Sequence, residues 1–473
     1  MSDSNNFDLV VIGAGSAGFS AAITAADAQK KVALIGHGTI GGTCVNVGCV
    51  PSKTMIRAAE AIHGAETARR FPGLSARGRV ENFQRLAEAK DQLVAGLRQK
   101  KYLDILPRYP NITYVEEGPA TLVEGGARVN GKTFMAKKII IATGSRPMIP
   151  PIPGIEDIKA LDSTSLLALE ELPESLLFVG GGYIGAELAQ AMARFGVRVT
   201  MVFRSSLLPG VEPEISRNLT QSLENEGMKI VNRVSYKSVA RTGDGISLAI
   251  ERFGKPLQLK AQHLVLATGR VANSTGMGLE EAGVQTDEKG SIIVNSSMQT
   301  SNENIYAAGD VTDRDQFVYM AAYGAKLAAR NAMLKEDDSA RQTYDNSTMP
   351  WVVFTDPQVA GVGLSEEQAR SRGHEVKTSI LPMDQVPRAL AARNTSGLIK
   401  LVADKKTDRL LGGQINAPEG ADTIQTLAMA LKFSMTAREL GETIFPYLTN
   451  VEGLKLAAQT FDMDVSKLSC CAG

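Results

Sequence analysis

The stretch that decides the fold of this 473-residue chain is LVVIGAGSAG, residues 9–18. Its first four residues form an apolar run typical of a buried parallel strand, and the alanine-rich segment 19–28 predicts a helix. A second apolar run, 32–35, predicts the next strand. In this context Gly13, Gly15 and Gly18 permit a tight turn and the close approach of a dinucleotide pyrophosphate to a helix N-terminus. The alternative is a glycine-rich turn of purely structural use.

The chain repeats this unit in the segment 176–202, where the glycine stretch GGGYIG lies between an apolar strand and a predicted helix over 186–195. Two units predict two dinucleotides, and the commonest chemical reason for such a pair is a flavin with a nicotinamide. We assign Gly180, Gly182 and Gly185 to the nicotinamide nucleotide. The second strand of this unit is followed by Arg204 rather than an acidic residue, which favours the 2'-phosphate of NADPH. The alternative for Arg204 is a solvated loop charge.

Three further strand ends complete the nucleotide-binding pattern. Residues 304–311 form a short apolar strand ending at Asp310, whose carboxylate can accept a hydrogen bond from a ribityl hydroxyl of FAD. Two more strands end in Ala-Thr-Gly, at 142–144 and 267–269. We therefore expect an α/β fold with a FAD-binding and central domain over 1–149 and 271–348, an NADPH-binding domain over 150–270, and an interface domain over 349–473.

Composition limits the partners of the chain. Its 51 basic and 51 acidic residues give a formal net charge of zero, so no overall field attracts nucleic acid or an anionic membrane. The first residues are polar and acidic, unlike a secretory signal, and glycines interrupt the apolar stretch 7–26. We expect a cytoplasmic protein that acts on a small molecule or ion.

The four cysteines fall in two pairs, Cys44 with Cys49 and Cys470 with Cys471. Cytoplasmic thiols are normally reduced, so these pairs indicate redox or metal chemistry rather than a structural staple. Pro51 suits the first turn of a helix, which places Cys49 near a helix N-terminus and makes it the more stable thiolate. The alternative for the first pair is two inert buried thiols.

The segment GGTCVNVGCVPSK, residues 41–53, resembles the redox-active motif of the pyridine nucleotide-disulfide oxidoreductases. This resemblance extends from about Phe7 to the C-terminus. It implies a fold similar to that of glutathione reductase, with two Rossmann-like domains for FAD and NADPH, a C-terminal α+β dimerisation domain and a homodimer whose active site is shared between subunits. It also implies that Cys49 contacts the flavin, that Cys44 exchanges with substrate, and that Lys53 beside the flavin pairs with Glu187. Further contacts implied by the family motifs are Gly42, Thr43, Lys53, Thr143, Gly144 and Val318 for FAD, and Glu187 and Gly269 for NADPH.

One departure from the family concerns the FAD ribose. Members usually carry a glutamate after the second strand of the first unit, but here Ile35 is followed by Gly36-His37-Gly38. FAD is still expected to bind through Gly13, Gly15, Gly18 and Asp310, but this position offers no acidic side chain to the ribose.

A second departure concerns acid–base chemistry. Members that reduce organic disulfides use a C-terminal histidine before a proline, and this chain has Phe445 there, while its four histidines all lie earlier. Phenylalanine cannot shuttle a proton, which disfavours reduction of an organic disulfide. A soft metal ion needs no such transfer, and vicinal cysteines can both bind one.

These features together resemble the Hg(II)-reducing members of the family. The resemblance implies that Cys44, Cys49, Cys470 and Cys471 bind Hg(II) delivered as a thiol complex, that Tyr183 and Tyr447 line the mercury site, and that the product is Hg(0). It also implies a catalytic core without the additional N-terminal metal-binding domain of many members. Two alternatives stay open: an NADPH-dependent reductase of a disulfide with the C-terminal cysteines as electron shuttle, and a metal-binding or redox-sensing protein without turnover.

Overall fold

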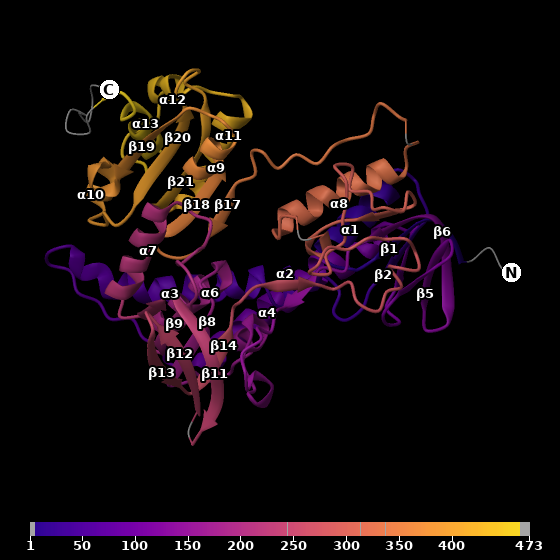
Figure 1. The fold of residues 1–473 in the computed structure, drawn as a ribbon, viewed down its shortest axis with the longest axis horizontal. Helices are drawn as coiled ribbons and strands as arrows, with labels where there is room; N and C mark the ends of the chain where they lie inside the picture. Colours follow the sequence, from indigo (N-terminus) through magenta and orange to yellow (C-terminus); the bar gives the residue numbers. More distant parts are fainter. Residues whose placement is uncertain (1–4, 244, 313, 336, 464–473) are drawn as a thin grey trace.

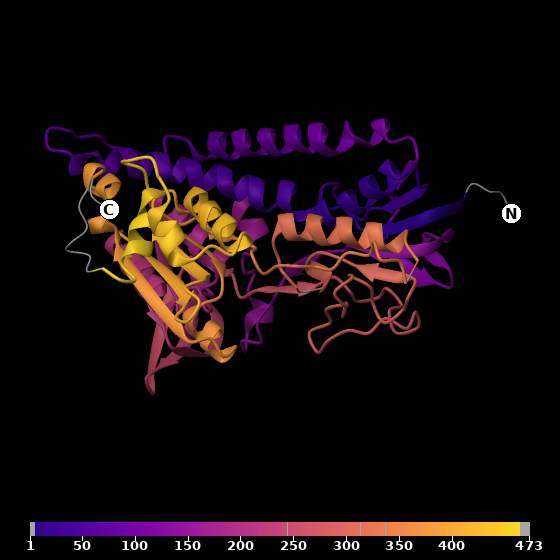
Figure 2. The same cartoon turned by 90° about the horizontal axis from the view of Figure 1, so that it is seen from above.

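The structure is a computed structural model that describes residues 5–243, 245–312, 314–335 and 337–463. The chain forms three lobes: the first and third are each built on one main sheet, and the second on two (Figure 1). The two long helices α3 (Cys49–Glu66) and α4 (Phe83–Arg98) run beside each other along one side of the molecule (Figure 2). None of the helices in the described part of the chain combines the length and the apolar character needed to cross a membrane.

The first lobe holds a mixed sheet in the order β3-β2-β1-β6-β5-β4. Strand β16 also belongs to this sheet, because it pairs with residues 139–141 of β6. Strands β1, β2, β3, β6 and β16 pair in parallel. The strands are β1 (Asn6–Ile12), β2 (Val32–Ile35), β3 (Ile112–Val115), β4 (Thr121–Val123), β5 (Gly126–Val129), β6 (Lys132–Ile141) and β16 (Ile305–Ala307). The helices besides α3 and α4 are α1 (Ser16–Asp27), α2 (Gly42–Asn46) and α8 (Val318–Ala332).

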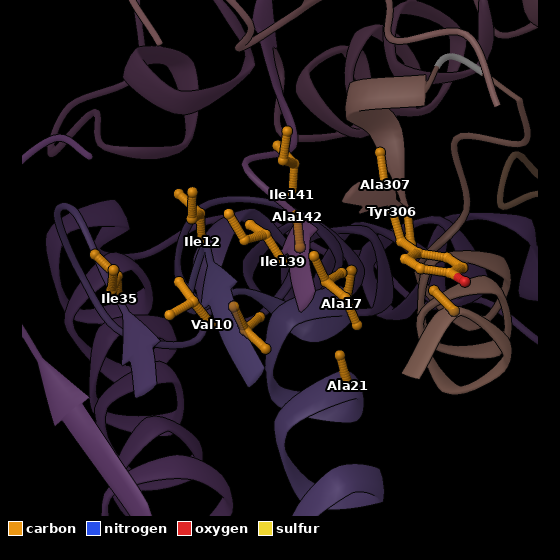
Figure 3. Packing of buried hydrophobic residues seen from close by; sticks show 14 of the residues in the cluster. Val10, Ile12, Ala17, Ala21, Ile35, Ile139, Ile141, Ala142, Tyr306 and Ala307 are labelled. Atoms are coloured by element: carbon orange, nitrogen blue, oxygen red, sulfur yellow. The ribbon is translucent and has the colours of Figure 1, made fainter. Parts of the chain in front are cut away.

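The core of this lobe lies between the sheet and the packed helices α1 and α8. Val10 and Ile12 on β1 point into it with Ile139 and Ile141 on β6, and Ala17 on α1 packs close to them (Figure 3). Small alanines on α1 allow the helix to approach the sheet closely. Helix α1 begins at Ser16, earlier than the predicted residue 19, because the last turn of the glycine motif is itself helical.

The second lobe contains a parallel sheet in the order β10-β9-β8-β14 and an antiparallel sheet β11-β12-β13. Its strands are β8 (Ser175–Val179), β9 (Arg198–Phe203), β10 (Lys229–Asn232), β11 (Val234–Thr242), β12 (Gly245–Arg252), β13 (Lys255–Ala261) and β14 (His263–Leu266). Its helices are α5 (Ser163–Leu167), α6 (Tyr183–Arg194) and α7 (Pro213–Asn225). The short pair β7 (Ser145–Pro147) and β15 (Arg270–Ala272) lies next to the expected domain boundaries, which stay predictions.

The third lobe is a five-stranded antiparallel sheet in the order β17-β18-β21-β20-β19, with a core shared with its helices. The strands are β17 (Trp351–Val353), β18 (Gln358–Gly363), β19 (Val376–Pro382), β20 (Leu398–Asp404) and β21 (Leu410–Ala417). The helices are α9 (Glu366–Ser371), α10 (Pro387–Ala391), α11 (Gly420–Lys432), α12 (Ala437–Glu442) and α13 (Glu452–Gln459). The predicted α/β architecture with two nucleotide-binding sheets and a separate C-terminal α+β lobe is confirmed.

Candidate active site

A cavity of about 1090 Å³ opens at the carboxyl ends of β1 and β6 and extends to the second and third lobes. It brings together most of the residues expected from sequence. Those that line it are Gly13, Gly15, Gly42, Thr43, Cys44, Cys49, Lys53, Thr143, Gly144, Tyr183, Glu187, Asp310 and Val318. Gly18 lies just behind this wall, where a Cβ atom would overlap the carbonyl oxygen of Gly13.

The residues at the first strand–helix turn fit a dinucleotide. Gly13 has a left-handed backbone with φ of 117°, and a Cβ atom there would overlap the carbonyl oxygen of Ala142. Helix α1 has Gly15 as its N-cap, with no side-chain cap and no acidic residue in its first turn. Its first amides and the positive end of its dipole are therefore available to a pyrophosphate, as FAD requires.

Asp310 lies in a small polar network at the same end of the sheet. Ser145 donates a hydrogen bond from Oγ to Asp310 Oδ2 at 2.8 Å, and Arg270 Nε donates to Ser145 Oγ at 2.7 Å. Arg270 Nε is also 3.9 Å from Asp310 Oδ2. The carboxylate is thus held in one orientation at the cavity wall, where a polyol chain can donate to its other oxygen.

The two N-terminal cysteines are side by side as free thiols, and their side chains are hydrogen bonded to each other. Helix α3 begins at Cys49, as the sequence predicts, with Gly48 as its N-cap. The hydrogen bond from Cys44 and, to a smaller extent, the charge of Lys53 lower the pKa of Cys49 to about 7 against the opposing effect of burial. The same hydrogen bond, followed by burial, raises the pKa of Cys44, so Cys49 is the thiolate of the pair.

One carboxylate connects all three lobes beside this pair. Lys53 Nζ on α3 lies 2.7 Å from Glu187 Oε2 on α6. The backbone N–H of Phe354, which follows β17, donates to Glu187 Oε1 at 2.9 Å. Glu187 is only 6% exposed, so these two partners compensate much of the cost of burying its charge.

Aromatic rings line the cavity on the side of α6. Tyr183, the first residue of α6, stacks on Trp351 with ring centroids 5.7 Å apart and also contacts Phe317. Burial raises the pKa of Tyr183 to about 12, so its hydroxyl is protonated at neutral pH and can donate a hydrogen bond. The ring of Tyr183 therefore forms part of the cavity wall.

The second glycine unit forms a separate cradle. Helix α6 has Gly182 as N-cap, with no side-chain cap and no acidic residue in the first turn. Gly180 mirrors Gly13, because a Cβ atom there would overlap the carbonyl oxygen of Ala267. Gly180, Gly182, Gly185, Arg204 and Gly269 are not part of the lining of the first cavity. Arg204 is exposed directly after β9, so its guanidinium is accessible to a phosphate.

Of the remaining predicted residues, one lies away from the cavity of its own chain and two are outside the described part of the chain. Tyr447 is 52% exposed and does not line the cavity of its own chain. Cys470 and Cys471 lie outside the described residues. Within the described ranges, no three His, Cys, Asp or Glu side chains come together in an arrangement that would hold a metal ion.

Sequence inspection missed three residues of the site. Ser145 and Arg270 fix Asp310, and Trp351 supports Tyr183. Arg270 follows the strand end 267–269, a signal that could have identified it. Ser145 and Trp351 carry no motif, because their roles depend on contacts between segments distant in sequence.

Comparison with known proteins agrees with this geometry. The family described as pyridine nucleotide-disulphide oxidoreductase matches residues 7–329, and the dimerisation domain of the same family matches residues 349–458. Mercuric reductase from Staphylococcus aureus is 44% identical over 469 residues, covering 99% of this chain and 85% of the relative. Mercuric reductase from Streptomyces lividans is 43% identical over 473 residues, covering 99% and 98%.

Solved structures of related enzymes share the fold. The HOCl-induced flavoprotein disulfide reductase RclA from Escherichia coli, as its Cu(II) complex, superposes with a TM-score of 0.84 at 30% identity, covering 96% of this chain and 99% of the other. LpdA from Mycobacterium tuberculosis gives a TM-score of 0.84 at 25% identity, covering 96% and 100%.

Proposed function

Because this chain belongs to the pyridine nucleotide-disulphide oxidoreductase family, we propose that it is a flavoenzyme that reduces Hg(II) to Hg(0) with electrons from NADPH. The observation that carries the proposal is the sequence identity of 42–44% to mercuric reductases along nearly the whole chain, together with the Cys44–Cys49 pair at the cavity. FAD bound at the first glycine unit would accept a hydride from NADPH and pass two electrons on to the cysteines and the metal.

The cysteine pair gives the substrate two sulfur ligands. Hg(II) is a soft cation, and thiolate is the ligand type in proteins that suits soft metals best. Cys44 exchanges onto an incoming Hg(II)–thiol complex, and its proton leaves with the small thiol that it displaces. Cys49, which its lowered pKa keeps as the thiolate beside the flavin site, then displaces the second small thiol and becomes the second sulfur ligand. Lys53 balances the negative charge of this pair from the adjacent turn of α3.

Phe445 supports a metal rather than an organic disulfide as substrate. Its ring packs against the core of the third lobe and offers no group that can transfer a proton. Transfer of Hg(II) between thiols proceeds by associative exchange and needs no such group at this position. We place Cys470 and Cys471 as the first acceptors of Hg(II), which they then pass to Cys44 and Cys49.

The remaining parts of the proposal concern the nucleotide, the assembly and the compartment. Arg204 supports NADPH over NADH because its exposed guanidinium can pair with a 2'-phosphate. The dimerisation domain supports a homodimer, in which Tyr447 and the C-terminal cysteines of one subunit complete the site of the other. NADPH is regenerated inside cells, so we place the activity in the cytoplasm.

The proposal is tested by following anaerobic NADPH oxidation with Hg(II) in excess small thiol, and separately with oxidised glutathione. Oxidation that depends on Hg(II) and is much faster than with the disulfide is expected. Oxidation with oxidised glutathione alone would instead favour the disulfide-reductase alternative, and no oxidation with either substrate would favour a sensor or binding protein.

A further inference from the structure

The end of β2 lacks the group that usually holds the ribose of a dinucleotide. In units of this kind an acidic side chain after the second strand accepts hydrogen bonds from the ribose hydroxyls. Here Gly36 occupies that position and lines the cavity together with His37 and Gly38. Gly36 does not have the left-handed backbone that requires glycine, so something other than the local conformation excludes a side chain.

The space for a side chain at position 36 is taken by Tyr114. A Cβ atom on Gly36 would lie 2.7 Å from Tyr114 Oη and 3.1 Å from the Cβ atom of Ala14. The Tyr114 hydroxyl is buried and has no hydrogen-bond partner among the described residues. Tyr114 therefore excludes a carboxylate from the end of β2, and the tyrosine itself comes from the adjacent strand β3.

A free carboxylate stands at the end of that adjacent strand. Strands β2 and β3 are parallel, with Ile35 paired to Val115, so Glu116 is the next residue opposite Gly36. Neighbouring strands are about 4.8 Å apart, and paired residues of parallel strands point to the same face, so a glutamate on β3 can reach the space beside β2. Glu116 is exposed and makes no hydrogen bond or ion pair with another described side chain.

Two further observations bring Glu116 close to the cavity, although Glu116 itself is not part of the cavity wall. The cavity wall includes the segment 36–38 on one side of Glu116 and the segment 118–120 on the other. Burial, and after it the negative charge of Glu116, raises the pKa of Tyr114 to about 12, so that hydroxyl is a protonated donor close to the carboxylate.

We propose that Glu116 replaces the missing acidic residue of β2 and accepts the hydrogen bonds of the adenosine ribose of FAD, with Tyr114 as a positioning residue. In this arrangement the acidic side chain follows β3 instead of β2, at the same edge of the sheet. This inference concerns retention of FAD and does not depend on the metal substrate, so it can fail or succeed independently of the proposed function.

The test is the rate at which the holoenzyme releases FAD, followed by the rise in flavin fluorescence. Glu116→Gln is expected to release FAD about tenfold faster, as for loss of a charge-assisted hydrogen bond. The matched control is Glu117→Gln, the next residue, whose carboxylate pairs with Lys132 at 2.8 Å. This control is expected to release FAD at the wild-type rate.

Two additional measurements identify the ribose as the partner. Holoenzyme loaded with the FAD analogue that lacks the 2'-hydroxyl of adenosine should release it faster than FAD, and Glu116→Gln should add little to that rate. In the Glu116→Gln background, Gly36→Glu combined with Tyr114→Val should restore slow release, because it returns a carboxylate to β2 and removes the side chain that excludes it.

The proposal is overturned if Glu116→Gln releases FAD at the wild-type rate. It is also overturned if His37→Asn accelerates release of FAD but not of the 2'-deoxy analogue, while Glu116→Gln affects both alike, because the ribose contact would then belong to the imidazole. Thermal midpoints of the variants, measured on the same samples, show whether each fold is intact.

Discussion

Lys53 Nζ and Glu187 Oε2 lie 2.7 Å apart although their residues are 134 positions apart in the chain. One belongs to the helix that begins at Cys49 and the other to the helix of the second glycine unit. The ion pair therefore ties the thiol site to the nucleotide unit that faces it. A single carboxylate makes this connection and also accepts the N–H of Phe354 from the third lobe.

Glu187→Gln should lower NADPH-dependent turnover about tenfold or more. The amide can still accept the N–H of Phe354, but it no longer neutralises Lys53, whose ammonium group then loses its fixed position at the cavity. Because Lys53 is about one-third exposed, the cost in stability is only about 1 kcal/mol. Steady-state kinetics and thermal midpoints separate these effects.

The control for this change is Glu60→Gln. Glu60 pairs with the well-exposed Arg57 on the same helix at 2.6 Å and does not line the cavity. Equal losses of turnover in Glu187→Gln and Glu60→Gln would show that the position of Lys53 has no special importance.

Removing the hydrogen-bond donor of Cys44 should raise the pKa of Cys49 above its value of about 7. In the reduced enzyme Cys44→Ala should therefore react more slowly with iodoacetamide at pH 7, with a midpoint shifted toward the ordinary thiol value of about 8.5. Cys44→Ser keeps a donor and should retain most of the lowered midpoint. Identical midpoints in the two variants would contradict the role given to this hydrogen bond.

The lowered pKa of Cys49 also makes the stability of the reduced enzyme depend on pH. Its folded value lies below the ordinary thiol value, so the thiolate stabilises the folded, reduced enzyme. That contribution is fully present above about pH 8.5 and is lost as the pH falls through about 7. Thermal midpoints of the reduced wild type should fall over this window more than those of a variant carrying Cys49→Ala.

Gly18→Ala should prevent tight FAD binding and lower stability by about 2–3 kcal/mol, because its Cβ atom overlaps the carbonyl oxygen of Gly13 in the turn at the FAD cradle. Gly64→Ala is the matched change in the helix α3, where a Cβ atom meets nothing within 4 Å. It should raise stability by about 0.5–1 kcal/mol. Flavin content and thermal midpoints test both; retention of full flavin content by Gly18→Ala would contradict the steric account.

Lys400→Met should cost about 3–5 kcal/mol of stability. Lys400 is 2% exposed on β20 and lies 2.8 Å from Glu212, which is 5% exposed and immediately precedes α7 of the second lobe. Removing the ammonium group leaves that carboxylate buried with a major partner lost. Lys406→Met breaks a pair that is 70% and 57% exposed and should change little. Equal thermal midpoints in the two variants would contradict the importance of this interlobe contact.

The sequence predicts the two glycine units correctly because their signal is local: apolar strands, glycines and helices follow each other without interruption. The position of Cys49 at a helix start follows in the same way from Pro51. Helices α1 and α6 begin three residues before their predicted starts, at Ser16 and Tyr183, since the glycine motif extends into the first turn.

Contacts between segments that are distant in sequence have no such local signal. The pairing of Lys53 with Glu187 is expected only through family resemblance, and the structure brings the two together. The support of Asp310 by Ser145 and Arg270 has no motif, since it arises where β7 and β15 pair. The neighbourhood of Gly36 and Glu116 likewise depends on the register of β2 with β3, which residue types alone do not fix.

The central claim is most directly tested by measuring Hg(0) against NADPH. Anaerobic enzyme with Hg(II) in excess small thiol should release one volatile Hg(0) for each NADPH oxidised, and the variant with Cys44→Ala and Cys49→Ala should release almost none. NADPH oxidation by the wild type without matching Hg(0), or undiminished Hg(0) release by the double variant, would contradict the account.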